Sequence, residues 1–503
     1  MTDVRLIDVS LRDGNQSIWG AVGVRTGTIE RVAPHINAAK YYAAEAATST
    51  MFATAVRYHR EDPWDRLDAL RKAAPDTMLG FLTTGKRFIT FSRTPSNLFK
   101  LAFELLRRHG VTRLWVIDPM HDMEAAMSTA RLAKEAGFEE IIGGLCYTIS
   151  PVHTDAYFTE KIAQFDNCDA IDSIYIKDPA GLLTPERLQT LVPSLRRGLK
   201  NKVIDELHTH CNTGLAPLTL LTGADLGLHR LHCALPPLAE GASHASAMQL
   251  VHNLRARGHT VDVDLDAMQK ASDLLMREAR LRNLPEGKPL LYDEAYYRHT
   301  LPGGVLSTTA RQLREMGKEH LMPAVVEEAQ QVRADLGWPI VVTPFAQYIV
   351  TQAALNVMAQ ERYQRISDEV VDMLLGDWGP MPGPIDPDLL DRVHELPRAR
   401  QRATRAEQEA PSLEELRHRF GGSLTDEDLL LRAVMPGEQM DAMIVDRDSR
   451  RRARAGGADL GLRELAAALS DPQRPLSIQV AQGDATLTLT GRRTAPARQG
   501  TTK

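Results

Sequence analysis

Polar side chains suited to binding a metal follow three short apolar runs of the sequence. Asp13 follows the first run, Lys177 lies near the end of another, and His208 and His210 lie at the end of a third. Residues two apart in a strand face the same side, so the two imidazoles would point the same way. Two ring nitrogens and one carboxylate suit zinc, manganese or cobalt. We therefore predict a divalent metal site that includes Asp13, His208 and His210.

Lys177 could join this site only in a modified form. A metal cation repels an ammonium group, whereas a lysine carbamylated by carbon dioxide is an anion on a long stem. The residue types leave a second interpretation open, in which Lys177 pairs with Asp178 or reaches solvent.

Arg12 and Gln16, on either side of Asp13, are suited to hold a small acid. A guanidinium binds a carboxylate through two parallel hydrogen bonds. The amide of Gln16 could donate a hydrogen bond to a neighbouring carbonyl oxygen. A metal that coordinates a 2-oxo acid would polarise its carbonyl and stabilise an enolate. The alternative for Arg12 is a structural salt bridge.

Eight short apolar runs alternate with helical stretches through residues 1–240. The runs are Val4–Val9, Tyr42–Ala47, Met78–Thr83, Arg113–Asp118, Glu140–Tyr147, Ser173–Asp178, Val203–His210 and Arg230–Leu235. Strands that alternate with helices imply a parallel sheet, and eight such units fit a closed (β/α)8 TIM barrel. No G-x-G-x-x-G follows the first run, which disfavours a dinucleotide-binding fold. Because catalytic groups of such barrels lie at the C-terminal ends of the strands, the predicted site is placed there.

The pattern changes near residue 265, where long helical segments begin to dominate. We predict an α/β protein in three parts: a TIM barrel over residues 1–265, a mostly helical domain over 266–475, and a terminal hairpin with a disordered tail over 476–503. Residues 476–489 alternate apolar and polar side chains around Gly483-Asp484, which is typical of a hairpin.

Composition and charge limit which binding partners and which cellular compartment we expect for this chain. A formal charge of −5 gives no reason to expect nucleic acid, and no apolar run approaches the ~20 residues of a membrane helix. The four cysteines are scattered, and the N-terminus does not read as a signal peptide, so we expect a reducing cytoplasm.

Several motifs resemble the carboxyltransferase component of biotin-dependent enzymes, a family that includes pyruvate carboxylase, the oxaloacetate decarboxylase alpha subunit and the transcarboxylase 5S subunit. The matching stretches are LRDGNQS (11–17), REDPWDRL (60–67), CYTISPVHT (146–154), IKDPAGLLTP (176–185), HTHCNTG (208–214), LPGG (301–304), VTPFAQYIVTQAALNVM (342–358) and TDEDLLLRAVMP (425–436). They span almost the whole chain, so the resemblance implies the family's fold, with a TIM barrel followed by helices.

The resemblance also implies roles for individual residues. The family's metal is held by an aspartate, a carbamylated lysine and two histidines, which correspond to Asp13, Lys177, His208 and His210. Its keto acid is held by an arginine and a glutamine, which correspond to Arg12 and Gln16. The sequence contains no Met-Lys-Met biotin acceptor, which is compatible with the 5S-like members, whose carrier is a separate protein. The partners that the resemblance implies are a biotin carboxyl carrier protein, a biotin carboxylase subunit and further copies of the chain in a homo-oligomer.

The chain departs from the family at positions that shape the biotin pocket. Compared with the family's motifs, Ala53, Thr84 and Phe91 replace an aspartate, an arginine and a tyrosine, and Ala242 replaces the threonine that moves a proton. The side chains that could substitute are Ser243, His244, Lys86 and Arg87. We therefore expect Thr84, Lys86, Ala242 and Ser243 in the substrate pocket and His244 among the catalytic groups.

Three functions compete at this point. The first is a carboxyltransferase subunit that moves a carboxyl group between carrier-bound biotin and a 2-oxo acid such as pyruvate or oxaloacetate. The second is a biotin-independent decarboxylase or aldol-type lyase on the same metal, with His244 or Cys211 as proton donor. The third is a non-catalytic scaffold, which the intact metal motif argues against.

Overall fold

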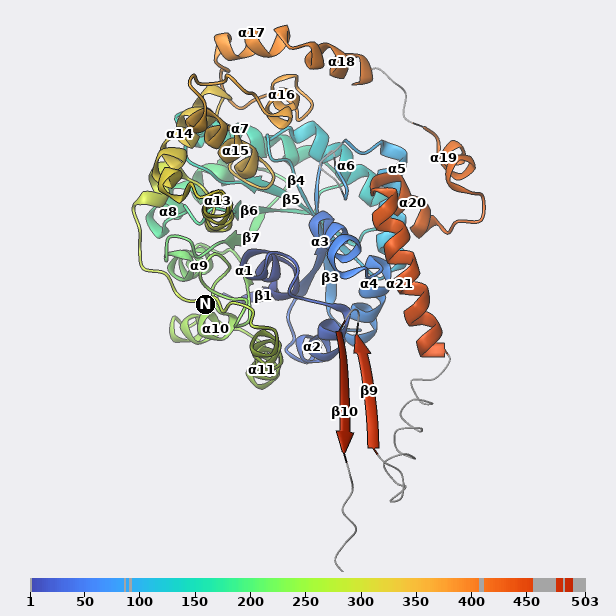
Figure 1. The fold of residues 1–503 in the computed structure, drawn as a ribbon. Coiled ribbons are helices and arrows are strands. Elements are labelled where there is room, and N and C mark those ends of the chain that lie inside the picture. The colour runs from blue at the N-terminus through green and yellow to red at the C-terminus, as the bar shows by residue number, and fades with distance from the viewer. Residues whose placement is uncertain are drawn as a thin grey trace, which may run out of the picture. The chain divides into compact units, whose positions relative to one another are not determined.

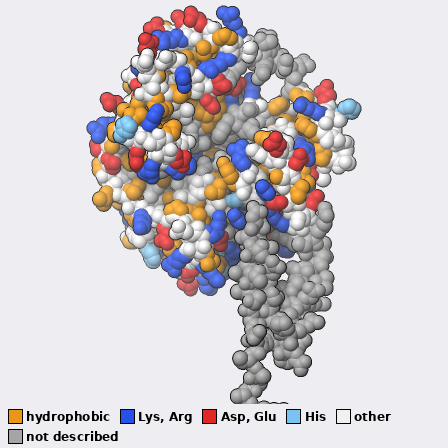
Figure 2. Space-filling model, in the orientation of Figure 1, with side chains coloured by type: hydrophobic (Ala, Val, Ile, Leu, Met, Phe, Trp, Pro, Cys, Tyr) orange, Lys and Arg blue, Asp and Glu red, His pale blue; other side chains and the backbone are white. Residues whose placement is uncertain are grey.

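The computed structural model describes residues 2–85, 87–89, 93–406, 411–455, 476–482 and 485–491. Two compact units are present, one within residues 1–440 and one within residues 441–503. On the face shown in Figure 2, the described surface carries acidic, basic and apolar side chains interspersed. Among the described helices, none combines the length and apolar character that a bilayer crossing requires.

Eight parallel strands close into a barrel in the order of the chain, which confirms the predicted TIM barrel (Figure 1). Each strand lies on one of the predicted apolar runs. The strands are β1 (Arg5–Asp8), β2 (Ala43–Thr48), β3 (Met78–Thr84), β4 (Arg113–Ile117), β5 (Glu140–Cys146), β6 (Ser173–Asp178), β7 (Ile204–Thr209) and β8 (Arg230–Cys233). The barrel closes through pairing of β1 with β8, in which Asp8 is opposite Cys233.

Helices connect successive strands, and several begin at the residues that the sequence provides as caps. Asp62 accepts a hydrogen bond from the Trp64 N–H at the start of α4, and Thr184 caps α8 in the same way. The principal connecting helices are α2 (Thr26–Ala38), α4 (Pro63–Ala73), α5 (Ser96–Arg108), α6 (Met123–Glu135), α7 (Asp155–Ala163), α8 (Pro185–Arg197), α9 (Ala216–Asp225) and α10 (Ala247–Ala256). Two short helices, α1 (Asn15–Trp19) and α3 (Ser49–Thr54), follow β1 and β2.

The predicted helical region follows the barrel. Its helices are α11 (Leu265–Arg282), α12 (Ala295–His299), α13 (Gly303–Glu315), α14 (Met322–Asp335), α15 (Phe345–Met358), α16 (Asp368–Leu374), α17 (Pro387–Glu395), α18 (Pro397–Ala406), α19 (Leu413–Phe420), α20 (Asp426–Val434) and α21 (Gly437–Ala455). Leu336, Ile349 and Val371 share one continuous apolar core with Leu82 and Ile117 of the barrel. Helices α14, α15 and α16 therefore pack with the ends of barrel strands. The boundaries of the helical domain, placed at residues 266 and 475 from the sequence, stay a prediction.

An antiparallel strand pair lies near the end of the chain. Strand β9 (Leu476–Gln482) pairs with β10 (Ala485–Gly491), and Gln482 is opposite Ala485. The expected turn residues Gly483 and Asp484 and the expected tail lie outside the described residues.

A buried ionic cluster occupies the barrel interior. The guanidinium of Arg113 bonds to both Glu140 and Glu206, and the indole N–H of Trp115 also donates to Glu206. Arg113 and Glu206 are fully buried. Because removal of one member would leave a buried charge without its partner, the cluster fixes these side chains strongly.

Replacement of Gly80 on β3 tests this packing. A Cβ atom at Gly80 would lie 2.0 Å from a ring atom of Trp115. We expect Gly80→Ala to lower the free energy of unfolding by about 1–3 kcal/mol, because the indole must shift from its place over the ionic cluster. Denaturant unfolding measures this loss. Gly27→Ala is the control, since a Cβ atom there would approach only the flexible Arg31 side chain, at 3.5 Å; equal losses in both variants would contradict the explanation.

Candidate active site

A π-helical turn directly after β1 presents Arg12 and Asp13. The turn covers Ser10–Gly14, and the Gly14 N–H donates to the Val9 carbonyl oxygen at 2.9 Å. A Cβ atom at Gly14 would lie 2.8 Å from the Leu238 carbonyl oxygen, so only glycine allows this close approach to the segment after β8. The motif that begins at Leu11 therefore places the Asp13 carboxylate against the ends of the other strands.

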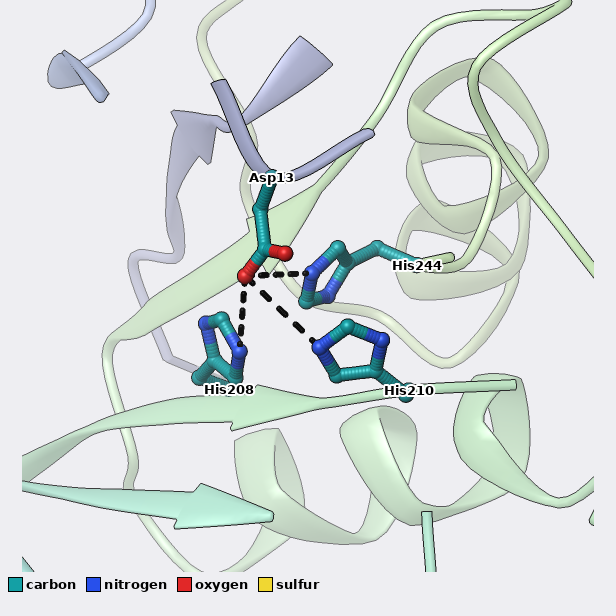
Figure 3. Close-up of side chains that lie close together, drawn as sticks. All are labelled: Asp13, His208, His210 and His244. Carbon is teal, nitrogen blue, oxygen red and sulfur yellow. Dashed lines mark ion pairs between the residues drawn. The ribbon is translucent and has the colours of Figure 1, made fainter. Parts of the chain in front are cut away.

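Three imidazoles converge on one oxygen of that carboxylate (Figure 3). The Oδ2 atom of Asp13 lies 3.3 Å from His208 Nε2, 3.6 Å from His210 Nε2 and 3.4 Å from His244 Nε2. All four side chains are buried, and their potential ligand atoms lie within 4.8 Å of one another. The structure thus brings together three of the four expected ligands, Asp13, His208 and His210, and adds His244, which the sequence analysis placed among the proton donors.

The hydrogen bonds of two histidines show which ring nitrogen carries the proton. His210 Nδ1 lies 2.8 Å from the Ala242 carbonyl oxygen, and His244 Nδ1 lies 3.1 Å from that of Thr209. A carbonyl only accepts, so each Nδ1 donates, and in its neutral form such a ring directs its Nε2 lone pair toward Asp13. Lone pairs that face a carboxylate repel it unless a cation lies between them. The donor set therefore fits a divalent metal.

His208 is oriented by a chain of hydrogen bonds that begins at Glu206. His232 Nε2 lies 2.8 Å from Glu206 Oε1, and His232 Nδ1 lies 3.0 Å from His208 Nδ1. Burial would raise the pKa of Glu206, but Arg113 and the bond from His232 lower it to about 2. As an ionised acceptor, Glu206 requires His232 to donate through Nε2. His232 then accepts from His208 Nδ1–H, which leaves the lone pair of His208 on Nε2, toward Asp13.

The charge states agree with this assignment. Burial lowers the pKa of His244 to about 3, and burial together with the charge of Lys177 lowers that of His208 well below its usual range. Burial alone would raise the pKa of Asp13, but Arg12 holds it well below its ordinary value. One anion and neutral imidazoles are the protonation states that metal ligands need.

Lys177 lies beside this cluster. It is opposite His208 in the register of β6 and β7, and its Nζ is 2.9 Å from His208 Nε2 and 3.8 Å from Asp13 Oδ2. Burial lowers the pKa of the Lys177 amine. Its carbamylation stays a prediction.

Arg12 is paired with two carboxylates. Its Nη1 lies 2.6 Å from Asp13 Oδ2, and its Nε lies 3.4 Å from Glu45 Oε1. All three side chains are buried, and burial raises the pKa of Glu45 to about 7 even though Arg12 opposes the rise. Sequence analysis did not select Glu45, although a single acid in the apolar run Tyr42–Ala47 was a visible signal.

A cavity of about 400 Å³ opens beside these residues. From the barrel, Arg12, Asp13, Gln16, Lys177 and His210 line it. The helical region contributes further lining residues, which are Pro302, Gly304, Val305, Thr308, Val342, Thr343, Pro344, Gln347 and Trp378. The second part of the chain therefore completes the pocket that the barrel begins.

The remaining expected pocket residues divide into three groups. Thr84 and Ala242 line the cavity. Ser243 and His244 are fully buried and are not among its lining residues, nor is Cys211, so none of these three described side chains reaches the cavity. The expected position of Lys86 lies outside the described residues, as does that of Phe91.

Arg87, weighed as a substitute for the family arginine, also lines the cavity. Its Nη2 lies 2.8 Å from Asp377 Oδ2, and its guanidinium carbon lies 3.3 Å from the centre of the Trp378 ring. It therefore links the barrel rim to the helical region. Neither Asp377 nor Trp378 carried a signal in the sequence, because only the fold brings them to the barrel.

Comparison with known proteins identifies the class. One family model, described as HMGL-like, matches residues 105–275, and another, described as a conserved carboxylase domain, matches residues 296–464. A pyruvate carboxylase subunit of Methanocaldococcus jannaschii is 33% identical over 391 residues, which cover 78% of this chain and 68% of that relative. The methylmalonyl-CoA carboxyltransferase 5S subunit of Propionibacterium freudenreichii subsp. shermanii is 29% identical over 439 residues, which cover 86% of each chain.

Solved structures show the same fold. The carboxyl transferase domain of Rhizobium etli pyruvate carboxylase, solved with pyruvate, has a TM-score of 0.79 at 21% identity over 88% of this chain and 78% of that one. Barrel, helical region and sequence matches together define a carboxylase-type TIM-barrel enzyme. The chain belongs to the carboxyltransferase family of the biotin-dependent carboxylases, which confirms the resemblance of its motifs.

Substitution of His232 tests the chain of hydrogen bonds behind the cluster. We expect His232→Phe to weaken the binding of a divalent metal by roughly 10–100-fold, because His208 loses the acceptor that fixes its tautomer. Titration with Co²⁺, followed by calorimetry, measures the affinity.

Tyr175→Phe is the matched control for that variant. The Tyr175 ring stacks on His232 at a centroid distance of 6.0 Å, and its buried hydroxyl makes no hydrogen bond with the described residues. Its metal affinity should stay within about twofold of the parent. Equal affinities for the parent and a folded His232→Phe protein would argue that His232 plays no part in orienting His208.

Proposed function

We propose that this chain transfers a carboxyl group between biotin on a separate carrier protein and a 2-oxo acid bound beside Asp13. The observation that carries the proposal is the convergent donor set of Asp13, His208 and His210, of which Asp13 and His210 line a cavity of about 400 Å³. Family membership supplies the class of reaction. The cavity supplies a place where a small acid meets both that donor set and Arg12.

Asp13, His208 and His210 would hold a divalent metal, with zinc, manganese and cobalt as the candidates. When bound, such an ion supplies Lewis-acid polarisation of a substrate carbonyl. The protein contributes the orientation: Gly14 lets the Asp13 turn approach, and His232 fixes the ring of His208.

Arg12 and Gln16 would bind the keto acid. Gln16 lines the cavity, and its buried side-chain oxygen has no hydrogen-bond partner among the described residues. A half-turn of the amide would place its NH2 group, which is a donor, at that position. Arg12 also lines the cavity, but Asp13 and Glu45 already share its charge. Arg12 therefore both holds Asp13 in place and offers its remaining N–H groups to a substrate carboxylate.

The names of the relatives support a 2-oxo acid as substrate. They include pyruvate carboxylase and, at 27% identity over 88% of this chain, the 2-oxoglutarate carboxylase large subunit of Hydrogenobacter thermophilus. In the transfer, the bond between the carboxyl carbon and the biotin nitrogen breaks. A carbon–carbon bond forms next to the keto group, and the proton displaced from that carbon passes to biotin. The methyl group of Ala242 cannot carry this proton, so a hydroxyl or amine elsewhere in the cavity must do so.

The proposed partners follow from the size of the relatives. The chain covers 45% of a complete multifunctional pyruvate carboxylase from Rhizobium etli. We propose that a biotin carboxyl carrier protein and a biotin carboxylase act together with this chain, and that the chain forms a homo-oligomer.

A biotin-independent decarboxylase is the second candidate. The observation in its favour is that Thr84 and Ala242, which depart from the family at biotin-pocket positions, do line the cavity. The scaffold alternative is weaker, because a non-catalytic barrel has no need of four buried ligand groups that converge on one point.

One assay separates these functions. The metal-loaded protein is incubated with oxaloacetate or oxalosuccinate, the carboxylated forms of pyruvate and 2-oxoglutarate, with and without free biotin. We expect release of the 2-oxo acid to rise with biotin concentration, to stop when a chelator removes the metal, and to return when Zn²⁺, Mn²⁺ or Co²⁺ is restored. Full turnover without biotin would favour the decarboxylase, and no turnover under any condition would favour the scaffold.

Gln16→Leu tests the substrate contact. Loss of one neutral hydrogen bond should raise the KM for the keto acid by roughly 3–10-fold and leave metal affinity unchanged, because Gln16 is not a proposed ligand. Gln189→Leu on the exposed face of α8 controls for the new apolar side chain. If the KM were the same in all three proteins, Gln16 would have no place in substrate binding.

A further inference from the structure

A second arginine lines the cavity from a different strand of the barrel. Arg87 follows β3, whereas Arg12 lies in the turn after β1. On the basis of the proposed function, we propose that Arg87 forms a second carboxylate-binding subsite of this cavity. The acid that binds beside Asp13 is then a 2-oxo dicarboxylic acid, with one carboxylate toward Arg12 and the other toward Arg87.

The backbone at the end of β3 positions Arg87. Thr84, the last residue of β3, pairs with Arg87 in an isolated antiparallel bridge, and Thr84 Oγ1 donates a hydrogen bond to the Arg87 carbonyl oxygen at 3.2 Å. The resemblance of the motifs places an arginine of the family at the position of Thr84. In this chain the short hydroxyl fixes the backbone of Arg87, and a guanidinium from three residues later reaches the cavity instead.

Two residues of the helical region hold the guanidinium of Arg87 in one orientation. Its carbon atom lies 3.3 Å from the centre of the Trp378 ring. Its Nη2 lies 2.8 Å from Asp377 Oδ2 and 3.1 Å from the Asp377 carbonyl oxygen. Trp378 is buried and packs edge-on against Phe345, with the ring centroids 4.7 Å apart. A guanidinium fixed in this way loses little conformational freedom when a ligand binds.

The two arginines of the cavity differ in how far their charge is compensated. Burial alone would lower the pKa of Arg12, but Asp13 and Glu45 raise it above its ordinary value. Burial also lowers the pKa of Arg87, and the acidic groups around it, Asp377 first, offset only part of that effect. The side chain of Asp377 is 41% exposed, so water shares its charge. The charge of Arg87 is thus less compensated than that of Arg12, which favours a further carboxylate beside Arg87.

The described lining of the cavity carries more positive than negative charge. Arg12, Arg87 and Lys177 are basic, and Asp13 is the one acidic side chain among the described lining residues, which leaves an excess of two positive charges. A carbamylated Lys177 together with a divalent ion would leave the same excess. An acid with two carboxylates matches this excess, whereas pyruvate, with one carboxylate, does not.

The spacing of the strands fits a five-carbon acid. In the closed barrel β2 lies between β1 and β3, so the ends of β1 and β3 are roughly 10 Å apart along the wall. The two carboxyl carbons of an extended five-carbon diacid are about 5 Å apart, and a charge-assisted hydrogen bond adds about 2.8 Å at each end. A chain of this length can therefore reach from Arg12 to Arg87. Residues 48–50, at the end of β2, line the cavity as well.

The first experiment compares two five-carbon acids that differ at one end. 2-Oxoglutarate has a distal carboxylate, and 2-oxovalerate has a methyl group in its place. Each acid is titrated into the Co²⁺-loaded protein in a calorimeter. We expect 2-oxoglutarate to bind roughly 10–100-fold more tightly, which is the range for a hydrogen bond between charged groups. Equal or reversed affinities would overturn the second subsite while the proposed function survives, and absence of binding by either acid would overturn both.

Arg87→Gln tests the residue itself. The variant should bind 2-oxoglutarate only as tightly as 2-oxovalerate, and its affinity for 2-oxovalerate should stay close to that of the parent, because a methyl group makes no charged contact. Arg131→Gln is the matched control, since it removes an exposed arginine of α6 that pairs with Glu124. The control should keep the preference of the parent for 2-oxoglutarate. The same preference in a folded Arg87→Gln protein would overturn the assignment.

Asp377→Asn distinguishes a subsite from a purely structural link. The substitution removes the carboxylate that competes for Arg87. A subsite should then bind 2-oxoglutarate more tightly than in the parent, while the affinity for 2-oxovalerate stays the same. A purely structural link would be weakened, so both acids would bind less tightly. That second outcome would restrict Arg87 to joining the barrel and the helical region, and it would overturn the subsite.

Discussion

The carboxylate of Asp13 facing three imidazole nitrogens is the interaction on which the active site depends. Acceptors gathered in a buried space need donors or cations beside them, and Arg12 and Lys177 contact this cluster directly. Gly14 must lack a side chain so that the Asp13 turn can approach the segment after β8. The carbonyls of Ala242 and Thr209 must be placed to accept from Nδ1 of two of the rings.

Support for this cluster reaches through the barrel. Arg113 keeps Glu206 ionised, Glu206 orients His232, and His232 orients His208. A buried ionic cluster is by itself weak evidence for stability. Here the cluster has a second effect, because it orients His208, a proposed metal ligand. The same residues that fill the barrel interior decide which nitrogen of His208 faces Asp13.

The helical region contributes shape to the pocket. Its residues Thr308, Gln347 and Trp378 line the cavity together with the barrel residues, and Arg87 joins the two parts through Asp377. The barrel therefore provides the proposed metal ligands. The barrel and the helical region together enclose the cavity in which we propose that the acid and biotin bind. Thr84 and Ala242, which the resemblance of the motifs marks as departures from the family, are among its lining residues.

The sequence alone determined the barrel, its eight strands, and three groups that meet in the site, because the period of apolar residues and the H-x-H spacing are local properties. Tertiary structure decided the rest. His244 lies on a loop after β8 with no motif of its own, and only closure of β8 against β1 brings it to Asp13. Glu206 lies on β7 and His232 on β8, and the hydrogen bond between their side chains depends on how these two strands pair. Contacts between distant segments depend on packing, which no local pattern encodes.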